Sequence, residues 1–548
     1  MAGPTNRRWR RKITRKEKQQ KYSIDERISI TKENQNDFNI LMALYFYRAL
    51  SSDQLFRLGV TNMKKNTLWS KMVYLTERKV IQKIVDDAKP SSSLHIKYRY
   101  TLTELGLKII LHSLDIPVWT KGKVRLYYSL NDLKIRAQKK HHFMSVDWVS
   151  RLQQKLKAAG IYAPDSEWRR YYNGDPNNLE TSYKPDWILF EPNIGNKTII
   201  ENQRYELHPF VYPLPVRDEH LTRVYEKIGD GRTWNWRSFF KPMMVLEMDT
   251  GSMKHKELAV KYQSILETMA REKESFPKVL VFANYLGRLG SKIDKSTGEN
   301  VIKSILPNSR KRLRNTRRNI VDVMRNALMN DELTVLHSDE YETIQTAADF
   351  VIHGQQWITH LDMSNLETFQ KLLNIHNAQD GRDARIFDPR TAAGREWKDI
   401  TAYGPGIPDF YIVQDEKRGS GSRFDRFEVK ELDFIFLARK GWVNPLAKAE
   451  EYAKWLSKGG EWGNVSRVRV ILLYPNRDEF MDEVFPTNFY SDNVYFVSFE
   501  EFQKTKVWGS VIKRGTTDKK GIRWIDLQNN ESDILEGGYD EVAHDQSD

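Results

Sequence analysis

Three ionisable residues on two neighbouring predicted strands have the types and spacing needed to hydrolyse a phosphodiester. Asp409 precedes the apolar run 410–413, and Glu428 and Lys430 follow a Gly/Ser-rich loop that should turn the chain. Because side chains alternate along a strand, Glu428 and Lys430 point to the same face. Carboxylate oxygens suit Mg²⁺ or Mn²⁺, and a nearby ammonium group can orient the attacking water. We therefore predict a metal-dependent hydrolytic site here; the alternative is a surface ion pair between Glu428 and Lys430.

A second acidic set lies earlier in the chain, at Asp186, Glu247 and Asp249. Asp186 precedes the apolar strand 187–190, and Glu247 and Asp249 alternate on one face of a buried strand. Three neighbouring carboxylates repel one another unless a cation binds or one is protonated, which favours a metal site. Solvent-exposed acids at strand ends are the alternative. His142 lies on an amphipathic helix, where it is either a catalytic base or a histidine of the core.

These two sets belong to separate α/β domains of a multidomain chain. Around each set the order is helix, strand with Asp, strand with acidic residues, helix and strand, which predicts a diverged internal pair. At 548 residues and 40% hydrophobic, the chain is long enough for several cores. The predicted parts are a basic flexible arm 1–30, a winged helix-turn-helix 37–115, a first α/β domain 125–345, a helical connector 346–385, a second α/β domain 386–515 and an acidic disordered tail 531–548.

The segment 37–115 has the element order of a winged helix-turn-helix. Apolar residues recur at helical spacing over 37–50, Ser51 offers a helix N-cap, and the hairpin 80–102 would form the wing. A recognition helix with lysines and an amide side chain suits phosphate and base contacts in a major groove. The predicted DNA-contacting residues are Lys64, Lys65, Asn66, Trp69 and Lys71. Docking of another protein is the alternative use of this domain.

Charge and composition favour a polyanionic partner and exclude several other classes. The net charge is +14 and the sequence pI is about 9.3, which is typical of proteins that bind nucleic acid. A basic cluster on one predicted helix is expected to contact phosphates through Arg310, Arg312 and Arg317. The chain lacks cysteine, which excludes disulfides and thiolate zinc sites. It has no apolar run of membrane-spanning length and no secretory signal, so we expect a cytoplasmic protein.

The signature residues of one nuclease superfamily occur at Pro408, Asp409, Glu428 and Lys430. They resemble the PD-(D/E)XK nucleases, which have the restriction-endonuclease-like fold, and here they come with the strand, loop, strand and helix order of that superfamily. The resemblance implies a deoxyribonuclease that depends on Mg²⁺ or Mn²⁺. It also implies an upstream helical carboxylate, for which Glu396 is the candidate, and a following helix whose Lys448 and Tyr452 would contact phosphate.

Residues 37–345 resemble the replication-relaxation proteins of Gram-positive plasmids and integrative elements. The resemblance rests on the winged helix and on four motifs: His142, the run KPD ending at Asp186, the run EMDTG beginning at Glu247, and Lys261 beside Tyr262. It implies handling of mobile-element DNA, such as nicking or origin processing, by divergent members of the same nuclease fold. Active members usually carry lysine where this chain has Asp249. Lys261 on the next helix could reach the same place; otherwise this site binds DNA without cutting it.

The predicted fold is therefore an N-terminal winged helix-turn-helix followed by two restriction-endonuclease-like α/β domains. Our first functional hypothesis is a metal-dependent DNA endonuclease or nickase of a mobile genetic element. A non-catalytic DNA-binding replication factor with degenerate nuclease folds is the second hypothesis, and a defence or transposon-end nuclease is the third. DNA is the expected partner and a membrane is not. A homodimer and other mobile-element proteins stay open as further partners.

Overall fold

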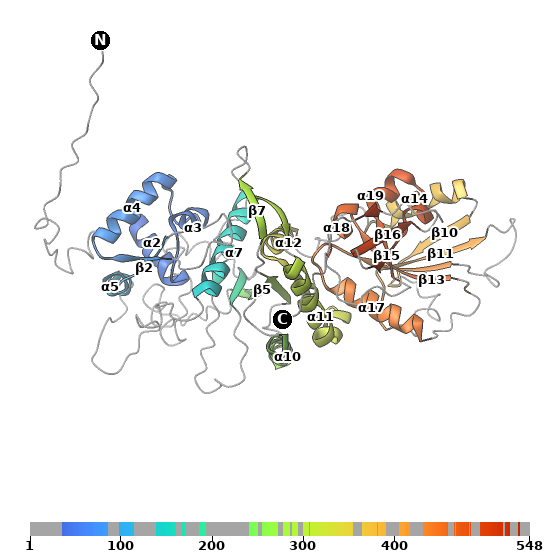
Figure 1. Ribbon diagram of the computed structural model, residues 1–548, viewed down its shortest axis with the longest axis horizontal. Helices are drawn as coiled ribbons and strands as arrows, with labels where there is room; N and C mark the ends of the chain where they lie inside the picture. The colour runs from blue at the N-terminus through green and yellow to red at the C-terminus, as the bar shows by residue number, and fades with distance from the viewer. Residues whose placement is uncertain are drawn as a thin grey trace, which may run out of the picture. The chain divides into compact units, whose positions relative to one another are not determined.

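The computed structural model is a mixed α/β protein with several sheets (Figure 1). The residues that it describes are 35–85, 98–113, 139–159, 167–169, 186–192, 240–249, 255–271, 278–284, 288–293, 300–305, 307–353, 364–380, 382–390, 405–416, 431–458, 465, 467–481, 483, 494–518, 521–526 and 535–536. The predicted basic arm, 1–30, lies outside these ranges. In the described part of the chain, none of the helices has the length and apolar character that crossing a membrane requires.

The first of two compact units is built from helices and a β-hairpin. Its elements are α2 (Gln35–Tyr47), α3 (Ser52–Arg57), α4 (Lys65–Glu77), β1 (Ile81–Val85), β2 (Tyr98–Leu102) and α5 (Glu104–Ser113). Ser51 begins α3 with a reciprocal capping box, because its hydroxyl accepts from the Gln54 N–H at 3.1 Å and the Gln54 side chain accepts from the Ser51 N–H at 2.9 Å. Leu50 exchanges two backbone hydrogen bonds with Tyr100, which attaches the hairpin to the helices.

A single hydrophobic core holds these elements together. Each helix turns an apolar stripe inward, and the fully buried residues on these stripes include Leu44, Leu55, Leu68 and Met72. Helix α5 packs closely on the hairpin at Gly106, where any side chain would meet the backbone carbonyl of Val80. The core therefore leaves the opposite face of α4 exposed to solvent, as the residues at 64–67, 69 and 70 show.

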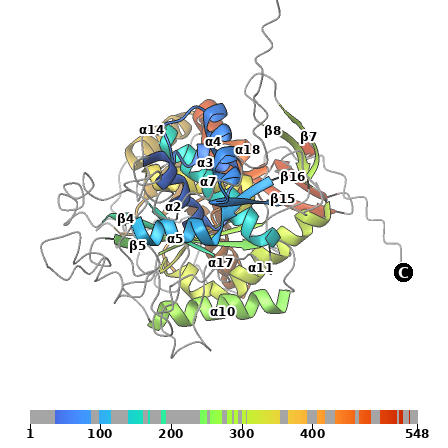
Figure 2. The ribbon, with the colours of Figure 1, turned by 90° about the vertical axis from the view of Figure 1, so that its left-hand side faces the viewer.

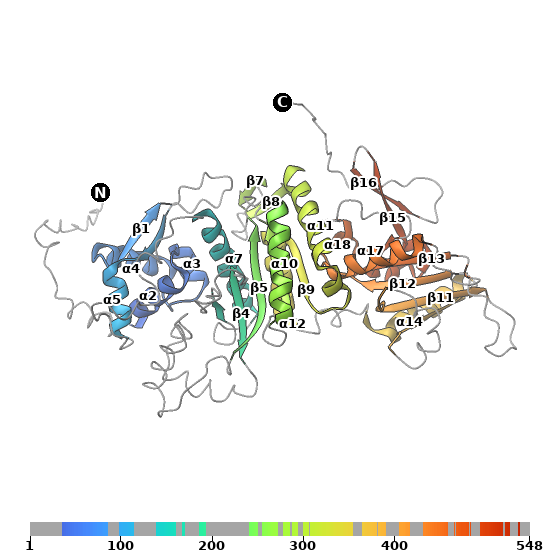
Figure 3. The same ribbon diagram turned by 90° about the horizontal axis from the view of Figure 1, so that it is seen from below.

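The second unit contains a five-stranded sheet with helices packed on it. Its strands lie in the order β3 (Glu167–Arg169), β4 (Trp187–Pro192), β5 (Phe240–Asp249), β6 (Val279–Asn284) and β9 (Thr334–Asp339). The first two strand pairs are antiparallel and the last two are parallel. The helices are α7 (Lys139–Ala158), α10 (His255–Arg271), α11 (Pro307–Met329) and α12 (Glu340–His353). Helix α7 packs against α12. Helix α10 packs against α11 (Figure 2). Figure 3 shows β4 and β5 between α7 and α10.

A second sheet in the same unit repeats this plan. Its first five strands are β10 (Arg382–Phe387), β11 (Phe410–Glu416), β12 (Glu431–Leu437), β13 (Arg467–Tyr474) and β14 (Val494–Ser498). Again the first two pairs are antiparallel and the next two are parallel. The sheet continues with β15 (Lys513–Asp518), β16 (Gly521–Asp526) and β17 (Leu535–Glu536). Its helices are α14 (Leu366–Asp380), α17 (Asn444–Ser457), α18 (Arg477–Met481) and α19 (Phe499–Thr505), followed by the 3-10 helix η6 (Trp508–Val511). A separate hairpin, β7 (Arg288–Ile293) and β8 (Asn300–Ile305), follows β6 of the first sheet.

Two predicted segments overlap described elements. Within the tail 531–548, which was expected to be disordered, the described residues 535–536 form β17 and pair with β16. The connector 346–385 is not a separate element. Its first part is the end of α12, which packs on α7, and its second part includes α14, whose Phe369 and Leu373 are fully buried in the core of the second sheet. Apolar residues on both helices therefore divide this segment between the two cores.

The two sheets place one aspartate in the same way. Asp186 lies just before β4, and its Oδ2 accepts a hydrogen bond from the Met248 N–H of the facing strand at 2.9 Å. Asp409 lies just before β11, and its Oδ2 accepts from the Leu437 N–H of its facing strand at 2.8 Å. Together with the shared strand order, this repeated contact shows which residues of the two sheets correspond.

Edge strand β9 joins the first sheet to the second within this unit. The His337 N–H donates to the Gly441 carbonyl at 2.7 Å, and the Val443 N–H donates to the Val335 carbonyl at 2.9 Å. Asn444, at the start of α17, accepts from the Val335 N–H and donates to the Leu333 carbonyl. Satisfied backbone groups at an otherwise open sheet edge make this junction specific.

Candidate functional site

Asp186 and Glu247 meet at the end of the first sheet. Trp187 pairs with Leu246, so Asp186 and Glu247 form the next position of the antiparallel ladder, with their side chains on one face. Asp249 lies two residues beyond Glu247 on the same face, at the carboxyl end of the parallel strands. Ligands of open α/β sheets bind outside this end of the strands. The three acids predicted from the sequence are therefore brought together.

Lys261 of α10 contacts Glu247 directly through its ammonium group. Burial alone would lower the pKa of Lys261, but Glu247 and Asp186 raise it to about 12. Lys261 therefore stays protonated at neutral pH and can act as a fixed positive charge, not as a proton acceptor. Tyr262, the neighbour that entered the same motif, is buried and packs edge-on against Phe282.

Asp249 is bound by Arg312 of α11 through two hydrogen bonds. The Arg312 Nε donates to Asp249 Oδ2 at 2.9 Å, and the Arg312 Nη2 donates to Asp249 Oδ1 at 2.7 Å. Bidentate pairs of this kind are among the strongest side-chain contacts because both charge and planar geometry match. A cation thus lies beside Asp249, the position at which the resemblance to the nuclease superfamily implies a lysine. Arg312 was expected to contact DNA phosphate, but in the structure it forms a bidentate pair with Asp249.

His141, and not the predicted His142, contacts the acidic residues. The His141 Nε2 lies 3.2 Å from Asp186 Oδ2 and 2.9 Å from the Met248 carbonyl oxygen. Both atoms are acceptors, so this nitrogen carries a hydrogen. Burial opposes the charged ring, yet the hydrogen bond and attraction of Asp186 raise the pKa of His141 above its ordinary value. His142 is instead buried and packs against Phe143 and Trp187. This position fits the alternative interpretation of His142 as a histidine of the core.

Asp186 is ionised at this site. Burial alone would raise the pKa of its carboxyl group, but Lys261 and His141 lower the pKa below its ordinary value. Lys261 and Arg312 therefore supply the compensating positive charge that was expected from a metal ion, and His141 adds to it when its ring is protonated. Repulsion among the acids no longer requires a metal, because the folded chain provides cations of its own.

The donor set still suits a hard divalent cation. Among the residues that the structure describes, no three His, Asp or Glu side chains form a metal-holding cluster. However, Mg²⁺ commonly takes only one or two carboxylates and keeps several waters. Asp186 Oδ2 and the Met248 carbonyl converge on one point, now occupied by the His141 Nε2 hydrogen, and Glu247 lies across from Asp186. Two carboxylates and one main-chain oxygen thus fit such an ion.

The corresponding place in the second sheet has a different composition. Phe410 pairs with Ile435, so Asp409 lies opposite Phe436. By the shared contact to the facing strand, Phe436 corresponds to Glu247 and Ala438 corresponds to Asp249. Burial raises the pKa of Asp409, against the attraction of Lys448. Apolar side chains thus stand where the first sheet has two acids.

The other residues predicted for this second site are Glu396, Glu428 and Lys430, and they lie outside the described residues. The first described residue of β12, Glu431, pairs with Gln414. Gln414 is five residues along β11 from Asp409, a separation of about 17 Å at a rise of ~3.4 Å per residue. Glu431 and Asp433 of this strand both bind Arg469.

Helix α4 presents only part of its predicted DNA-contacting set. Lys64, Lys65 and Asn66 are exposed, and the Trp69 side chain is 57% exposed. Lys71 instead lies on the inner side of the helix, where its ammonium group pairs with the buried Asp37 at 2.7 Å. Lys71 is therefore corrected from a DNA contact to a contact within the unit, because helical spacing turns it towards α2.

Two basic residues predicted to contact phosphate are also buried. Arg317 of α11 is completely buried and pairs with Glu483. Lys448 of α17 is 9% exposed and pairs with Asp331 at 2.5 Å. Arg317 is therefore corrected from a phosphate contact, because its side chain is buried with an acidic partner. The Lys448 ammonium group instead pairs with an aspartate that is 56% exposed. Tyr452 is buried as well, and its hydroxyl donates to the Gly406 carbonyl. The side chain of Arg310 is not among those that the structure describes.

Sequence reasoning missed several residues at the first site. His141 differs from His142 by one helical position, and the apolar pattern alone does not determine which of the two faces the acids. Asn284 and His337 lie on apolar strands and carried no motif, yet Asn284 contacts Asp249 and His337 contacts Asn284. A polar residue within a buried strand is the signal that could have found both. Comparison with known proteins identifies no family model that matches this chain, no curated protein that matches it and no solved structure that matches it.

Proposed function

We propose that this chain is a metal-dependent DNA endonuclease or nickase of a mobile genetic element, with its chemistry at the first sheet. One observation carries the proposal. Asp186 and Glu247 lie side by side on facing strands, and Lys261 reaches Glu247 from the next helix. This is the acid, acid and lysine combination of the PD-(D/E)XK nucleases, with the lysine supplied by α10. Each α/β domain is proposed to have the restriction-endonuclease-like fold.

Each residue of the site has a distinct role in this proposal. Asp186, Glu247 and the Met248 carbonyl would hold Mg²⁺ or Mn²⁺. A divalent cation at that point supplies Lewis-acid chemistry, since it lowers the pKa of bound water and offsets charge on the phosphate. Lys261 stabilises the negative charge that develops on phosphorus, because its raised pKa keeps it protonated. Without a bound ion, His141 holds the Asp186 carboxylate in place through its Nε2 hydrogen, and an ion at that point would take the place of this contact.

DNA binding is proposed to begin at the first unit, as a winged helix-turn-helix. Helix α4 is the recognition helix, and it exposes Lys64, Lys65, Asn66 and the Trp69 ring. Lysines and an amide suit phosphates and base edges, and an exposed indole can stack on or pack against the nucleic acid. The net charge of +14 supports a nucleic acid as the partner.

A non-catalytic DNA-binding replication factor is the second candidate. The observation that favours it is the pairing of the acids with Lys261, Arg312 and His141, which neutralises the site without a metal. Phe436 and Ala438 in the second sheet also fit a chain whose nuclease folds have lost their chemistry. In this case the chain would bind DNA through the same surface of α4 and cut nothing.

Cleavage of supercoiled plasmid DNA separates the two candidates. The purified chain is incubated with Mg²⁺, with Mn²⁺ and with a chelator, beside the variants Glu247→Gln and Glu257→Gln. Glu257 is an exposed carboxylate on α10, so it controls for loss of one charge near Lys261. We expect metal-dependent nicking or cleavage by the wild type and by Glu257→Gln, and none by Glu247→Gln. Binding of DNA without cleavage under every metal condition would support the second candidate.

A further inference from the structure

We propose that Arg317, His337 and Asn284 are positioning residues for the Asp249–Arg312 pair, and that Glu483 of the second α/β domain completes this relay. The inference rests on the proposed function, because it names what prepares that site. It assigns a role to the second domain that needs no chemistry of its own. The second domain would hold the Asp249–Arg312 pair of the first site in place through these buried residues.

The relay is a continuous chain of contacts from one domain to the other. Arg317 donates to Glu483 through Nη1, and its Nε lies 3.1 Å from His337 Nδ1. The His337 Nε2 lies 3.1 Å from Asn284 Oδ1. The Asn284 Nδ2 then lies 3.2 Å from Asp249 Oδ2. Each member reaches the next through a different atom, so the chain runs without a gap.

Chemistry determines the direction of every hydrogen bond in the relay. Arginine has only donors, so His337 Nδ1 must accept, and Nε2 must carry the hydrogen of the neutral ring. That hydrogen is donated to Asn284 Oδ1, which orients the amide and turns its Nδ2 hydrogens to Asp249. An ionised aspartate accepts only, so the chain ends there. Burial and the Arg317 charge both lower the pKa of His337, which keeps the ring neutral.

Complete burial makes this arrangement rigid. Arg317, His337, Asn284 and Glu483 are each at most 2% exposed. In a medium of low dielectric constant, a lost partner leaves a buried polar group unsatisfied, so alternative arrangements are costly. Asp249 Oδ2 thus accepts from both Asn284 Nδ2 and Arg312 Nε, and its Oδ1 accepts from Arg312 Nη2. Asp249 in turn lies close enough to Lys261 to help raise its pKa, after the larger effects of Glu247 and Asp186.

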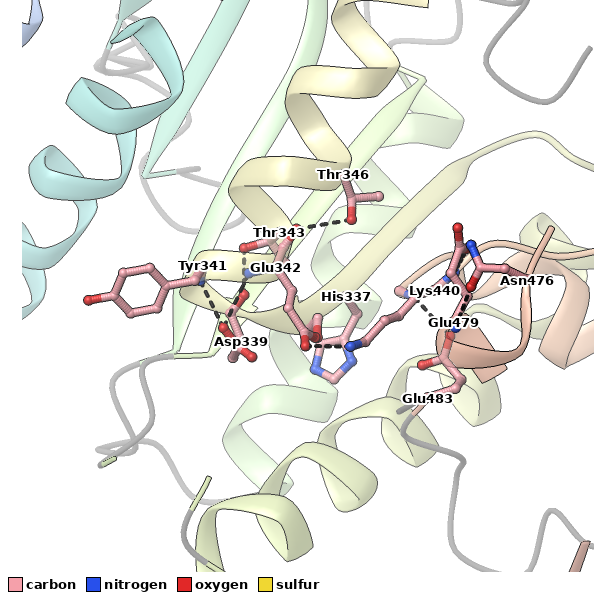
Figure 4. A network of polar contacts seen from close by, with 12 residues as sticks. His337, Asp339, Tyr341, Glu342, Thr343, Thr346, Lys440, Asn476, Glu479 and Glu483 are labelled. Carbon is pink, nitrogen blue, oxygen red and sulfur yellow. Dashed lines mark hydrogen bonds and ion pairs between the residues drawn. The ribbon is translucent and has the colours of Figure 1, made fainter. Parts of the chain in front are cut away.

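The second domain anchors the far end of the relay at the β9 junction. Glu483 follows α18, and its Oε2 accepts from the Gly441 N–H at 2.8 Å. The Gly441 carbonyl accepts from the His337 N–H, so Gly441 contacts both Glu483 and His337. Figure 4 shows His337 and Glu483 at this junction, beside the ion pair of Lys440 with Glu342 at 2.7 Å. Gly441 has φ +81°, a conformation that favours glycine and sets this turn.

Two substitutions at one position test the relay while keeping its volume similar. In His337→Asn the side-chain oxygen can take the place of Nδ1 and accept from Arg317, but the amide is too short to reach Asn284. In His337→Gln the amide nitrogen can take the place of Nε2 and donate to Asn284. We expect His337→Asn to lower the single-turnover cleavage rate roughly 10- to 100-fold, the range for lost supporting contacts. We expect His337→Gln to recover most of that loss, with DNA affinity unchanged in both.

Glu483→Gln tests the step between domains, with Glu479→Gln as its matched control. Glu479 lies at the same junction and accepts from the Lys440 N–H, but it is not a member of the relay. We expect Glu483→Gln to lower the cleavage rate and Glu479→Gln to leave it unchanged, at equal thermal stability of the folded chain. Equal rates for His337→Asn and His337→Gln, or equal effects of Glu483→Gln and Glu479→Gln, would overturn the proposal.

Nuclear magnetic resonance of ¹⁵N-histidine separates failure of the relay from failure of the proposed function. The relay predicts that His337 has an unprotonated Nδ1 and a protonated Nε2 across the neutral pH range. An inactive wild type with this signal refutes the nuclease assignment and leaves the relay in place. A His337 ring with the opposite tautomer overturns the relay whether or not the chain cuts DNA.

Discussion

The Lys261 ammonium contacts the Glu247 carboxylate across the junction between α10 and β5, directly opposite Asp186. Lys261 supplies the ammonium group that β5 itself lacks beside Glu247, because the residue two positions further along β5 is Asp249. The contact decides the role of Lys261, because a raised pKa makes it a permanent cation. Four predictions follow from this site and from the exposed face of α4.

Lys261→Met should abolish most cleavage while Lys261→Arg keeps a measurable part of it. Methionine preserves the length of the side chain but removes the charge that would stabilise the phosphorane, and a lost donor of this kind lowers rates by roughly 10²–10³-fold. Single-turnover cleavage of plasmid DNA measures the effect, with circular dichroism as the check on folding. Full activity of Lys261→Met would show that this ammonium group has no part in the reaction.

Asp186→Asn and Asp409→Asn should have opposite consequences. In both variants the amide oxygen can still accept from the facing N–H, of Met248 or of Leu437, so both folds should persist. Asp186→Asn removes an ionised ligand and should reduce cleavage by about 100-fold or more.

Asp409→Asn resembles the protonated form that burial favours in the folded chain. Ionisation of Asp409 opposes folding once the pH rises above the ordinary value of 3.8, so the variant should be as stable as the wild type or more stable at neutral pH. The comparison uses cleavage rates and chemical denaturation. Loss of cleavage in Asp409→Asn alone would move the chemistry to the second sheet.

The His141–Asp186 contact should make stability depend on pH. The pKa of His141 is raised above 6.5, so its stabilising contribution is complete below that pH and is lost as the pH rises through the folded-state value. The pKa of Asp186 is lowered below 3.8, so its contribution is present above 3.8 and is lost in stronger acid.

His141→Gln should therefore lower the free energy of unfolding most between these two limits and least in alkaline solution. Urea denaturation of wild type and variant across this range measures the difference. Asp147→Asn is a suitable control on the same helix, since Asp147 pairs with Arg151 away from the acids. A difference that does not change with pH would show that His141 is neutral in the folded chain.

Lys64→Ala with Lys65→Ala should weaken DNA binding and reduce its salt dependence. Each lost phosphate contact lowers the slope of log K against log salt by roughly 0.9 on duplex DNA. Lys71→Ala should instead destabilise the fold, because it leaves the buried carboxylate of Asp37 without its cation. Fluorescence anisotropy at several salt concentrations and thermal denaturation separate the two effects. An unchanged salt slope in the double variant would mean that another surface binds the DNA.

Much of the fold follows from local pattern. Apolar runs and helical stripes predicted the strands around Asp186, Glu247 and Asp409 and the helices of the first unit. Glu247 and Asp249 were predicted to share a face, because alternation along a strand is a property of the backbone. The lysine on α10 was also within reach of prediction, since it lies one helix after these acids. These features depend on near neighbours in sequence, which the chain itself specifies.

Strand register and long-range packing could not be predicted from the sequence. The loop before β12 could place several residues opposite Asp409, and only the complete sheet sets Phe436 there. In the same way, the basic residues of α11 are distributed around the whole helix. Only packing against β9 and the second α/β domain buries Arg317 and leaves Arg312 in contact with Asp249. Sequence alone determined which residues could do chemistry. Tertiary structure decided which of them meet, because pairing and burial depend on residues far apart in the sequence, such as Arg312 with Asp249 and Arg317 with Glu483.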